Sequence, residues 1–172
     1  VGSEMCIRDS YIEAQTNEKN LSFYNECKQD YDHLYSLISK KIPFSNIWLA
    51  YELSPRIPEG SVMHYAILNS LRAWSFFETP NTVRGYSNVG GFGIDGNISA
   101  LIGASLYNKD RLYFGIIGDL AFFYDMNTLG NRHVGKNVRI LLVNNGKGME
   151  FRNYTHPASR FSDVLVDQYM DC

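Results

Sequence analysis

The sequence predicts an α/β fold: a doubly wound, mainly parallel sheet with helices on both faces. Apolar runs of strand length alternate with segments of helix length along the chain. The stretch from Leu112 to Phe151 shows the pattern best, because apolar runs at 112–117 and 138–143 flank a helical segment at 120–133. Parallel strands need such crossover helices, which then cover the faces of the sheet.

The composition excludes several classes of function. A chain of 172 residues with 45% hydrophobic and 20% charged residues is long enough for one globular domain with a real core. A net charge of −2 gives no reason to expect nucleic acid or an anionic membrane as a partner. No apolar run approaches the roughly 18 residues that a membrane helix needs. Cys6, Cys27 and Cys172 fit neither a disulfide framework nor a zinc site, so we expect a cytoplasmic protein.

The two ends of the chain lead us to expect a fragment of a longer protein. Residues 1–10 (VGSEMCIRDS) resemble translated adaptor sequence, so we treat them as a non-native segment. Residues 11–58 read as a helical lead-in, and residues 59–172 as the α/β domain, which we expect to be truncated at both ends. A last amphipathic segment is expected at 159–170.

Two helices are expected in the lead-in, which would cover an edge or a face of the sheet. From 21 to 40, side chains recur at helical spacing on one face: Tyr24, Cys27, Tyr31, Leu34 and Ile38. A shorter helix is expected from 47 to 53, because Pro55 and Pro58 prevent its continuation.

Strands and helices alternate in the first half of the domain as well. Residues 61–68 read as a buried strand, 71–77 as a helix and 83–87 as a short strand. A glycine-rich turn follows at 88–96, and then a helix at 97–107. One side of this helix carries Ile98, Leu101, Ile102 and Ser105. The small residues of another side would allow close packing on the sheet: Ala100, Gly103 and Ala104.

Polar residues stand at the carboxyl ends of the two strands that flank segment 120–133. Gly118 and Asp119 follow the first strand, and Asn144 and Asn145 follow the second. Open α/β sheets bind ligands at the carboxyl ends of their strands, so Asp119 and Asn145 are expected to face one shared site.

Three interpretations of these residues are open. Residues 91–96 form a G-x-G-x-x-G with Asp119 lying 23 residues beyond, as in an NAD-binding Rossmann domain, although the preceding strand is poorly apolar and not directly adjacent. Alternatively, Asp119 only caps a helix and Asn144-Asn145-Gly146 is an ordinary turn. In the third, Asp119 and Asn145 bind Mg²⁺, and a diphosphate rests on N–H groups at the start of the next helix. Gly118 would leave room for that anion. No P-loop motif is present.

Several motifs together resemble thiamine diphosphate-dependent enzymes. Gly118-Asp119-Leu120, followed after 23 residues by Asn144-Asn145, is similar to their metal and diphosphate motif. Further motifs resemble the diphosphate-binding domain of the 2-succinyl-5-enolpyruvyl-6-hydroxy-3-cyclohexene-1-carboxylate synthase family. These are Asn69-Ser70-Leu71, Tyr86-Ser87-Asn88, Gly93-Ile94-Asp95-Gly96, Tyr124-Asp125-Met126-Asn127 and Leu142-Val143-Asn144-Asn145. The resemblance covers about residues 45–172 and implies the thiamine diphosphate-binding fold.

The resemblance implies a role for each matching residue. Asp119 and Asn145 would bind Mg²⁺ through their side chains, and Lys147 through its main-chain carbonyl. Three residues would contact the diphosphate through main-chain N–H groups: Gly118, Leu120 and Ala121. In the glycine-rich turn, Gly93 would belong to the cofactor-binding residues. Ile94 would be the apolar wedge that bends the cofactor, although an ordinary core position also explains it. Ser70 would lie near the other end of the diphosphate.

The resemblance also implies a decarboxylase or carboligase that acts on a small 2-oxo acid with thiamine diphosphate and Mg²⁺ as cofactors. The activating glutamate is expected on a pyrimidine-binding domain or partner subunit, so this chain alone should turn over little. The full-length protein is expected to be a homodimer or tetramer. The alternative is a non-catalytic cofactor-binding or regulatory module.

Two positions depart from the pattern of the synthase. Where the synthase has arginines for its dicarboxylate substrates, this chain has Trp74 and Val89. The nearby Arg72 would point elsewhere from its helix position. These departures disfavour the synthase's own substrates and favour a related enzyme with another substrate.

Overall fold

The computed structural model describes residues 21–38, 41–91, 93–146 and 148, and the chain divides into two compact units after Pro43. The described part of the first unit is mainly helix α2 (Ser22–Leu37), which confirms the helix expected there. None of the α2 residues is buried. Its expected contact with the sheet stays a prediction.

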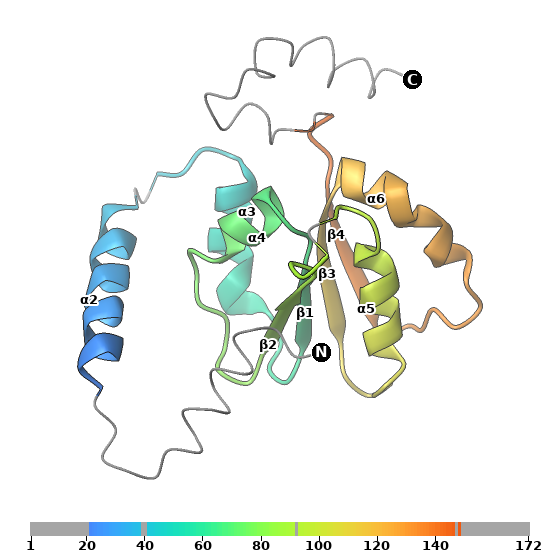
Figure 1. Cartoon of the computed structure of the whole chain (residues 1–172), viewed down its shortest axis with the longest axis horizontal. Helices are drawn as coiled ribbons and strands as arrows, with labels where there is room; N and C mark the ends of the chain where they lie inside the picture. The colour runs from blue at the N-terminus through green and yellow to red at the C-terminus, as the bar shows by residue number, and fades with distance from the viewer. Residues whose placement is uncertain (1–20, 39–40, 92, 147, 149–172) are drawn as a thin grey trace. The chain divides into compact units, whose positions relative to one another are not determined.

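A four-stranded sheet forms the centre of the second unit (Figure 1). Its strands are β1 (Val62–Tyr65), β2 (Arg84–Ser87), β3 (Tyr113–Gly118) and β4 (Val138–Val143). They lie in the order β2-β1-β3-β4, and every neighbouring pair is parallel. The predicted α/β fold with a parallel sheet is confirmed.

Helices cover both faces of this sheet (Figure 1). One face carries α3 (Asn46–Leu53), η1 (Ser54–Arg56) and α4 (Asn69–Trp74); the other carries α5 (Asn97–Ser105), α6 (Asp119–Asp125) and η2 (Met126–Gly130). The path from β1 to β2 crosses the sheet in one direction, and the path from β2 through β3 to β4 returns in the other. Because crossovers are right-handed, this reversal places α4 and α5 on opposite faces. The sheet is therefore doubly wound, with its switch point between β1 and β3.

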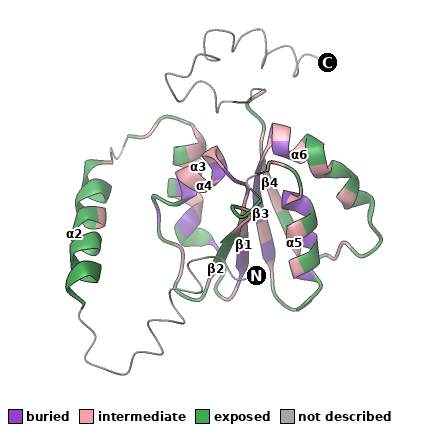
Figure 2. Ribbon diagram, viewed as in Figure 1, coloured by how far each residue is buried: buried purple, intermediate pink, exposed green. Residues whose placement is uncertain are grey.

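Buried side chains lie on both faces of the sheet, and two core clusters pack between the sheet and the helices α5 and α6 (Figure 2). The side of α5 that was expected to face the core is buried. It carries the buried residues Ile98, Leu101, Ile102 and Ser105. The expectation that small residues of α5 allow close packing is wrong for Gly103, which is exposed with no atom within 4 Å of a built Cβ. The close approach lies instead at Gly115 of β3, where a Cβ would come within 2.7 Å of Leu101 Cδ2.

Several elements differ from their expected bounds. The strand expected at 61–68 is shorter, as β1 spans Val62–Tyr65, and the helix expected at 97–107 ends at Ser105. The helix expected at 120–133 ends at Asp125 and continues only as the 3₁₀ segment η2, because Asp125 leaves the helical conformation with φ −131°. The helix expected from 71 begins at Asn69, directly after Leu68. Residues 1–10 and 159–170 lie outside the described residues, and the domain boundaries stay predictions. No helix in the described part of the chain is long and apolar enough to cross a membrane.

Candidate functional site

The carboxyl ends of β3 and β4 bring Asp119 and Asn145 together. Gly118 is paired with Val143 as the last residue pair of the two strands, so both polar segments begin at the same edge of the sheet. The main-chain N–H of Asn145 donates to Asp119 Oδ2 at 3.0 Å, across 26 residues of sequence. The structure therefore has the shared location that the sequence predicts for these two residues.

The carboxylate of Asp119 is almost fully buried and accepts hydrogen bonds from three main-chain N–H groups. Oδ1 accepts from Leu120 at 2.7 Å, and Oδ2 accepts from Asn145 at 3.0 Å and Gly146 at 2.8 Å. Asp119 therefore does more than cap a helix, since two of its hydrogen bonds reach the turn after β4. A carboxylate offers about four acceptor positions, so Oδ1 can still receive a cation.

Open space adjoins Gly118, the residue before α6. Its φ of −74° and ψ of 158° suit any residue, so backbone conformation does not require glycine here. A Cβ built on Gly118 meets no atom within 4 Å. The fold thus leaves open space beside Asp119, and this is compatible with the room that a bound anion would need.

The glycine-rich turn is held by two asparagine side chains. Asn88 Nδ2 donates to the carbonyl of Gly96 at 3.0 Å, and Asn97 Nδ2 donates to the carbonyl of Ile94 at 2.5 Å. Ile94 is half-buried and packs against a core cluster that includes Ala121 of α6. The candidate wedge residue and the candidate diphosphate residues therefore share one face of the sheet, although this packing also fits an ordinary core role for Ile94.

The other candidate residues fall in different places. Ser70 is buried in α4, directly after β1, at the same edge of the sheet as Asp119. A side chain on Gly93 would collide with the Asp95 carboxylate. Asn145 is exposed. The main-chain carbonyl expected from Lys147 lies outside the described residues.

Sequence reasoning missed a strained residue between β1 and α4. Leu68 has φ 68°, the one positive φ among the described residues other than glycine. Such a conformation costs about 1–3 kcal/mol, and residues of this kind concentrate at functional sites. The N–H of Leu71 donates to the Ala66 carbonyl at 3.0 Å and closes this turn, which aims α4 and Ser70 at the carboxyl edge. A leucine gives no sequence signal for such a conformation.

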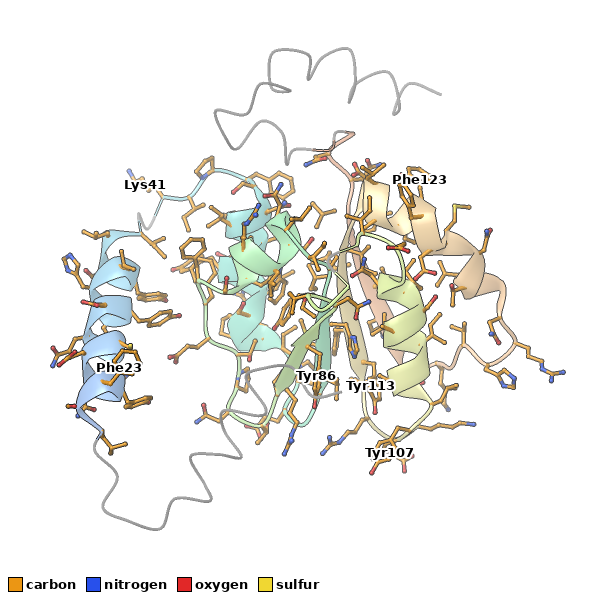
Figure 3. All side chains as sticks on the ribbon, viewed as in Figure 1. Phe23, Lys41, Tyr86, Tyr107, Tyr113 and Phe123 are labelled. Atoms are coloured by element: carbon orange, nitrogen blue, oxygen red, sulfur yellow. The ribbon has the colours of Figure 1, made fainter. Side chains whose placement is uncertain are left out.

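His64, at the middle of β1, was also missed. Its ring lies 5.7 Å from the ring of Tyr86, which is labelled on β2 in Figure 3, and its Nε2 is buried without a hydrogen-bond partner. Burial lowers the pKa of His64 from its ordinary value of 6.5. His64 is paired with Tyr86 of β2 and Gly115 of β3, so it lies within the sheet, before its carboxyl edge.

The strand order decides against the Rossmann interpretation. In that fold, the strand before the glycine motif is the immediate neighbour of the strand that ends in the ribose-binding acid. Here β2 precedes the glycines and β3 precedes Asp119, and β1 lies between them. Nine residues, 88–96, also separate β2 from α5.

The oxygen atoms expected as ligands at this edge would suit a hard cation. Among the described residues, no three or more side chains of His, Cys, Asp or Glu come together as a metal-binding group. The candidate set of one carboxylate, one amide and one main-chain carbonyl suits Mg²⁺, which commonly completes its shell with substrate phosphates. Asp119 Oδ1 and the open space at Gly118 are compatible with that arrangement.

A doubly wound parallel sheet with these residues at its carboxyl edge has the architecture of a thiamine diphosphate-binding domain. No protein-family model matches the chain. The chain is 36% identical over 140 residues to the 2-succinyl-5-enolpyruvyl-6-hydroxy-3-cyclohexene-1-carboxylate synthase of Bacteroides fragilis, which covers 81% of the chain and 24% of the relative. With the synthase of the same name from Christiangramia forsetii the identity is 36% over 120 residues, or 70% of the chain and 21% of the relative.

The synthase of the same name from Phocaeicola vulgatus is 40% identical over 110 residues, which cover 64% of the chain and 20% of the relative. The chain spans about a quarter of the length of the Bacteroides fragilis synthase (24%). These alignments confirm the resemblance seen in the motifs: the chain is related to a segment of thiamine diphosphate-dependent synthases of this name.

Proposed function

We propose that this chain is the diphosphate-binding domain of a thiamine diphosphate-dependent 2-oxo acid decarboxylase or carboligase that uses Mg²⁺. The observation that carries the proposal is the placement of Asp119, whose carboxylate joins the start of α6 to the turn after β4. The similarity to the synthases supports the same cofactor.

In this proposal, Asp119 Oδ1 and the side chain of Asn145 bind Mg²⁺, together with the main-chain carbonyl of Lys147. The N–H of Leu120 now donates to Asp119 Oδ1 at 2.7 Å. A cation would take the acceptor position of Oδ1 that this hydrogen bond leaves open, and the Leu120 N–H would also contribute to the diphosphate contacts. Gly118 and Ala121 donate their N–H groups to the same diphosphate, and the open space at Gly118 admits it.

The remaining residues shape the path of the cofactor across the edge of the sheet. Ile94 supports the cofactor from below and keeps it bent, Gly93 lets the turn approach closely, and Ser70 contacts the far end of the diphosphate. When bound, thiamine diphosphate stabilises the negative charge that develops when a carbon–carbon bond beside a carbonyl is broken or formed. The role of this chain is to hold and orient that group.

Activity requires a second, pyrimidine-binding domain or subunit that supplies the activating glutamate. We place the complete enzyme in the cytoplasm as a homodimer or tetramer. Its substrate differs from that of the synthases, because Trp74 replaces a substrate-binding arginine. Trp74 is buried and its ring lies 5.8 Å from the ring of Tyr65, so its side chain serves the core on the α4 face.

Thermal unfolding with different ligands tests this proposal. A ligand present at 100 times its Kd stabilises the folded state by about 2.7 kcal/mol, which raises Tm by several degrees. Thiamine diphosphate with Mg²⁺ should give this rise when the pyrimidine-binding domain is supplied, and NAD should not. A rise with NAD, or no rise with thiamine diphosphate and Mg²⁺, would contradict the proposal. Cofactor binding without turnover would favour the non-catalytic module.

A further inference from the structure

The carboxylate of Asp125, at the end of α6, is hydrogen-bonded to the start of α5, on the same face of the sheet (Figure 1). Oδ2 accepts the main-chain N–H of Ser99 at 2.6 Å, and Oδ1 accepts the Ser99 hydroxyl at 2.6 Å. The Thr128 hydroxyl donates to Oδ1 at 2.7 Å. Burial raises the pKa of Asp125, but hydrogen bonds from Ser99, Thr128 and the Ile98 main chain outweigh it and lower the pKa below its ordinary value.

This carboxylate supplies the cap that α5 lacks in its own sequence. The N-cap residue of α5 is Gly96, in the left-handed conformation with φ 74°, and it has no side chain to accept an N–H. The first N–H groups of a helix need such an acceptor, and negative charge is favourable at this end. Asp125 meets both needs for Ser99, from 26 residues away. The start of α5 is therefore fixed by the end of α6.

The two helices joined by this contact each adjoin part of the proposed site. The turn that carries Ile94 leads directly into α5, and Asn97 of α5 donates to the Ile94 carbonyl. Helix α6 begins with Asp119, and its Ala121 lies in the core cluster against which Ile94 packs. The Asp125–Ser99 contact thus sets where Ile94 stands relative to Asp119.

We propose that Asp125 is a positioning residue for the cofactor. Acting through α5, it holds the Ile94 turn in register with Asp119, so that one bent cofactor can contact both. This proposal rests on the proposed function, because it assigns Asp125 to the affinity for thiamine diphosphate. It adds a residue that lies outside the expected metal and diphosphate contacts.

The test compares Asp125→Asn with the unaltered chain, both supplied with the pyrimidine-binding domain. The amide keeps the shape of the carboxylate but loses its charge and one acceptor oxygen. Titration calorimetry with Mg²⁺ present should show thiamine diphosphate binding about tenfold more weakly, the loss expected for a hydrogen bond to a charged group. Without cofactor, amide hydrogen exchange in residues 93–98 should be faster than in the unaltered chain, while β3 is unchanged.

Two variants of Ser99 test the same contact from its other side, and they apply even if Asp125→Asn does not fold. Ser99→Ala removes only the hydroxyl contact and should weaken binding by a smaller factor. Ser99→Thr keeps the hydroxyl and should restore the affinity toward that of the unaltered chain. Weakening by Ser99→Ala without recovery in Ser99→Thr would overturn the role of this contact.

Two controls separate positioning from general loss of stability. Val62→Ala removes buried side-chain atoms at the amino-terminal end of β1, away from the carboxyl ends of the strands. It should lower Tm without changing the affinity for thiamine diphosphate. Asp110→Asn makes the same chemical change in an exposed turn before β3 and should change neither.

Three outcomes would overturn the proposal. The first is unchanged affinity in Asp125→Asn, and the second is a loss no larger than that of Val62→Ala at an equal fall in Tm. The third is that the unaltered chain itself binds no cofactor, while exchange in residues 93–98 is still faster in Asp125→Asn. In that last case the contact between the helices stands and the proposed function fails with the cofactor role, so the two failures are distinguishable.

Discussion

The carboxylate of Asp119 accepts the main-chain N–H of Gly146 at 2.8 Å, and so connects the ends of two neighbouring strands. Gly146 has φ 69°, a conformation that favours glycine, which lets the turn after β4 present two successive N–H groups to one oxygen. The Asp119 carboxylate therefore holds the ends of β3 and β4 together at the candidate metal site.

Replacing Asp119 by asparagine should reduce both stability and cofactor binding. The amide nitrogen cannot accept an N–H, so at least one of the three main-chain donors loses its partner, at a cost of about 1–3 kcal/mol. Urea unfolding without metal measures this loss. Stability within about 0.5 kcal/mol of the unaltered chain would show that these hydrogen bonds contribute little. Asp110→Asn, in an exposed turn, is the matched control.

Gly118→Ala should separate binding from stability. Its backbone conformation suits alanine and its Cβ would meet nothing within 4 Å, so the free energy of unfolding should stay equal or rise by up to about 1 kcal/mol. Thiamine diphosphate should nevertheless bind at least about tenfold more weakly, because the methyl group would occupy the space proposed for the diphosphate. Calorimetric titration checks this. Gly103→Ala, on the exposed side of α5, should leave binding unchanged; equal effects of the two variants would refute the proposed diphosphate position beside Gly118.

Gly115→Ala should have the opposite effect on stability. A Cβ there would come within 2.7 Å of Leu101 Cδ2 and 3.3 Å of Ile117 Cδ1, and both of these side chains are fully buried. Overpacking of this kind costs about 1–3 kcal/mol. Chemical denaturation should show this loss. A variant as stable as the parent chain would mean that α5 moves away from the sheet more easily than its packing suggests.

The stability of the domain should fall in mild acid because of His64. Burial holds its folded-state pKa below 6.5, so as pH falls below 6.5 the unfolded chain takes up the proton first. The contribution of His64 is complete above pH 6.5 and is lost as pH falls toward the folded-state pKa. His64→Phe should reduce the fall in Tm between about pH 7 and pH 5. Parallel pH profiles for the two chains would show that other groups cause the fall.

The sequence was sufficient to predict the elements whose cause is local. The apolar runs expected at 112–117 and 138–143 form the parallel pair of β3 and β4, because a right-handed crossover through a helix usually joins neighbouring strands. From that pairing, the proximity of Asp119 and Asn145 follows directly. The buried side of α5 was equally readable from its helical period.

Features that depend on distant contacts could not be predicted. The early end of α6 at Asp125 accompanies a carboxylate that bonds to Ser99, a contact across 26 residues. The positive φ of Leu68 contradicts the local preference of leucine and is held by the turn that α4 makes on β1. The close packing of helix α5 on the sheet depends on Gly115 of strand β3, and not on Gly103 of the helix itself.

Binding of Mn²⁺ tests the central claim most directly, because Mn²⁺ accepts the same oxygen ligands as Mg²⁺ and the signal of free Mn²⁺ can be followed by electron paramagnetic resonance. With the pyrimidine-binding domain supplied, addition of thiamine diphosphate to the unaltered chain should remove Mn²⁺ from solution in a one-to-one ratio, and addition to Asp119→Asn should not. Equal uptake by both chains, or uptake that does not depend on thiamine diphosphate, would contradict the assignment of Asp119 as a ligand of the metal that holds the cofactor.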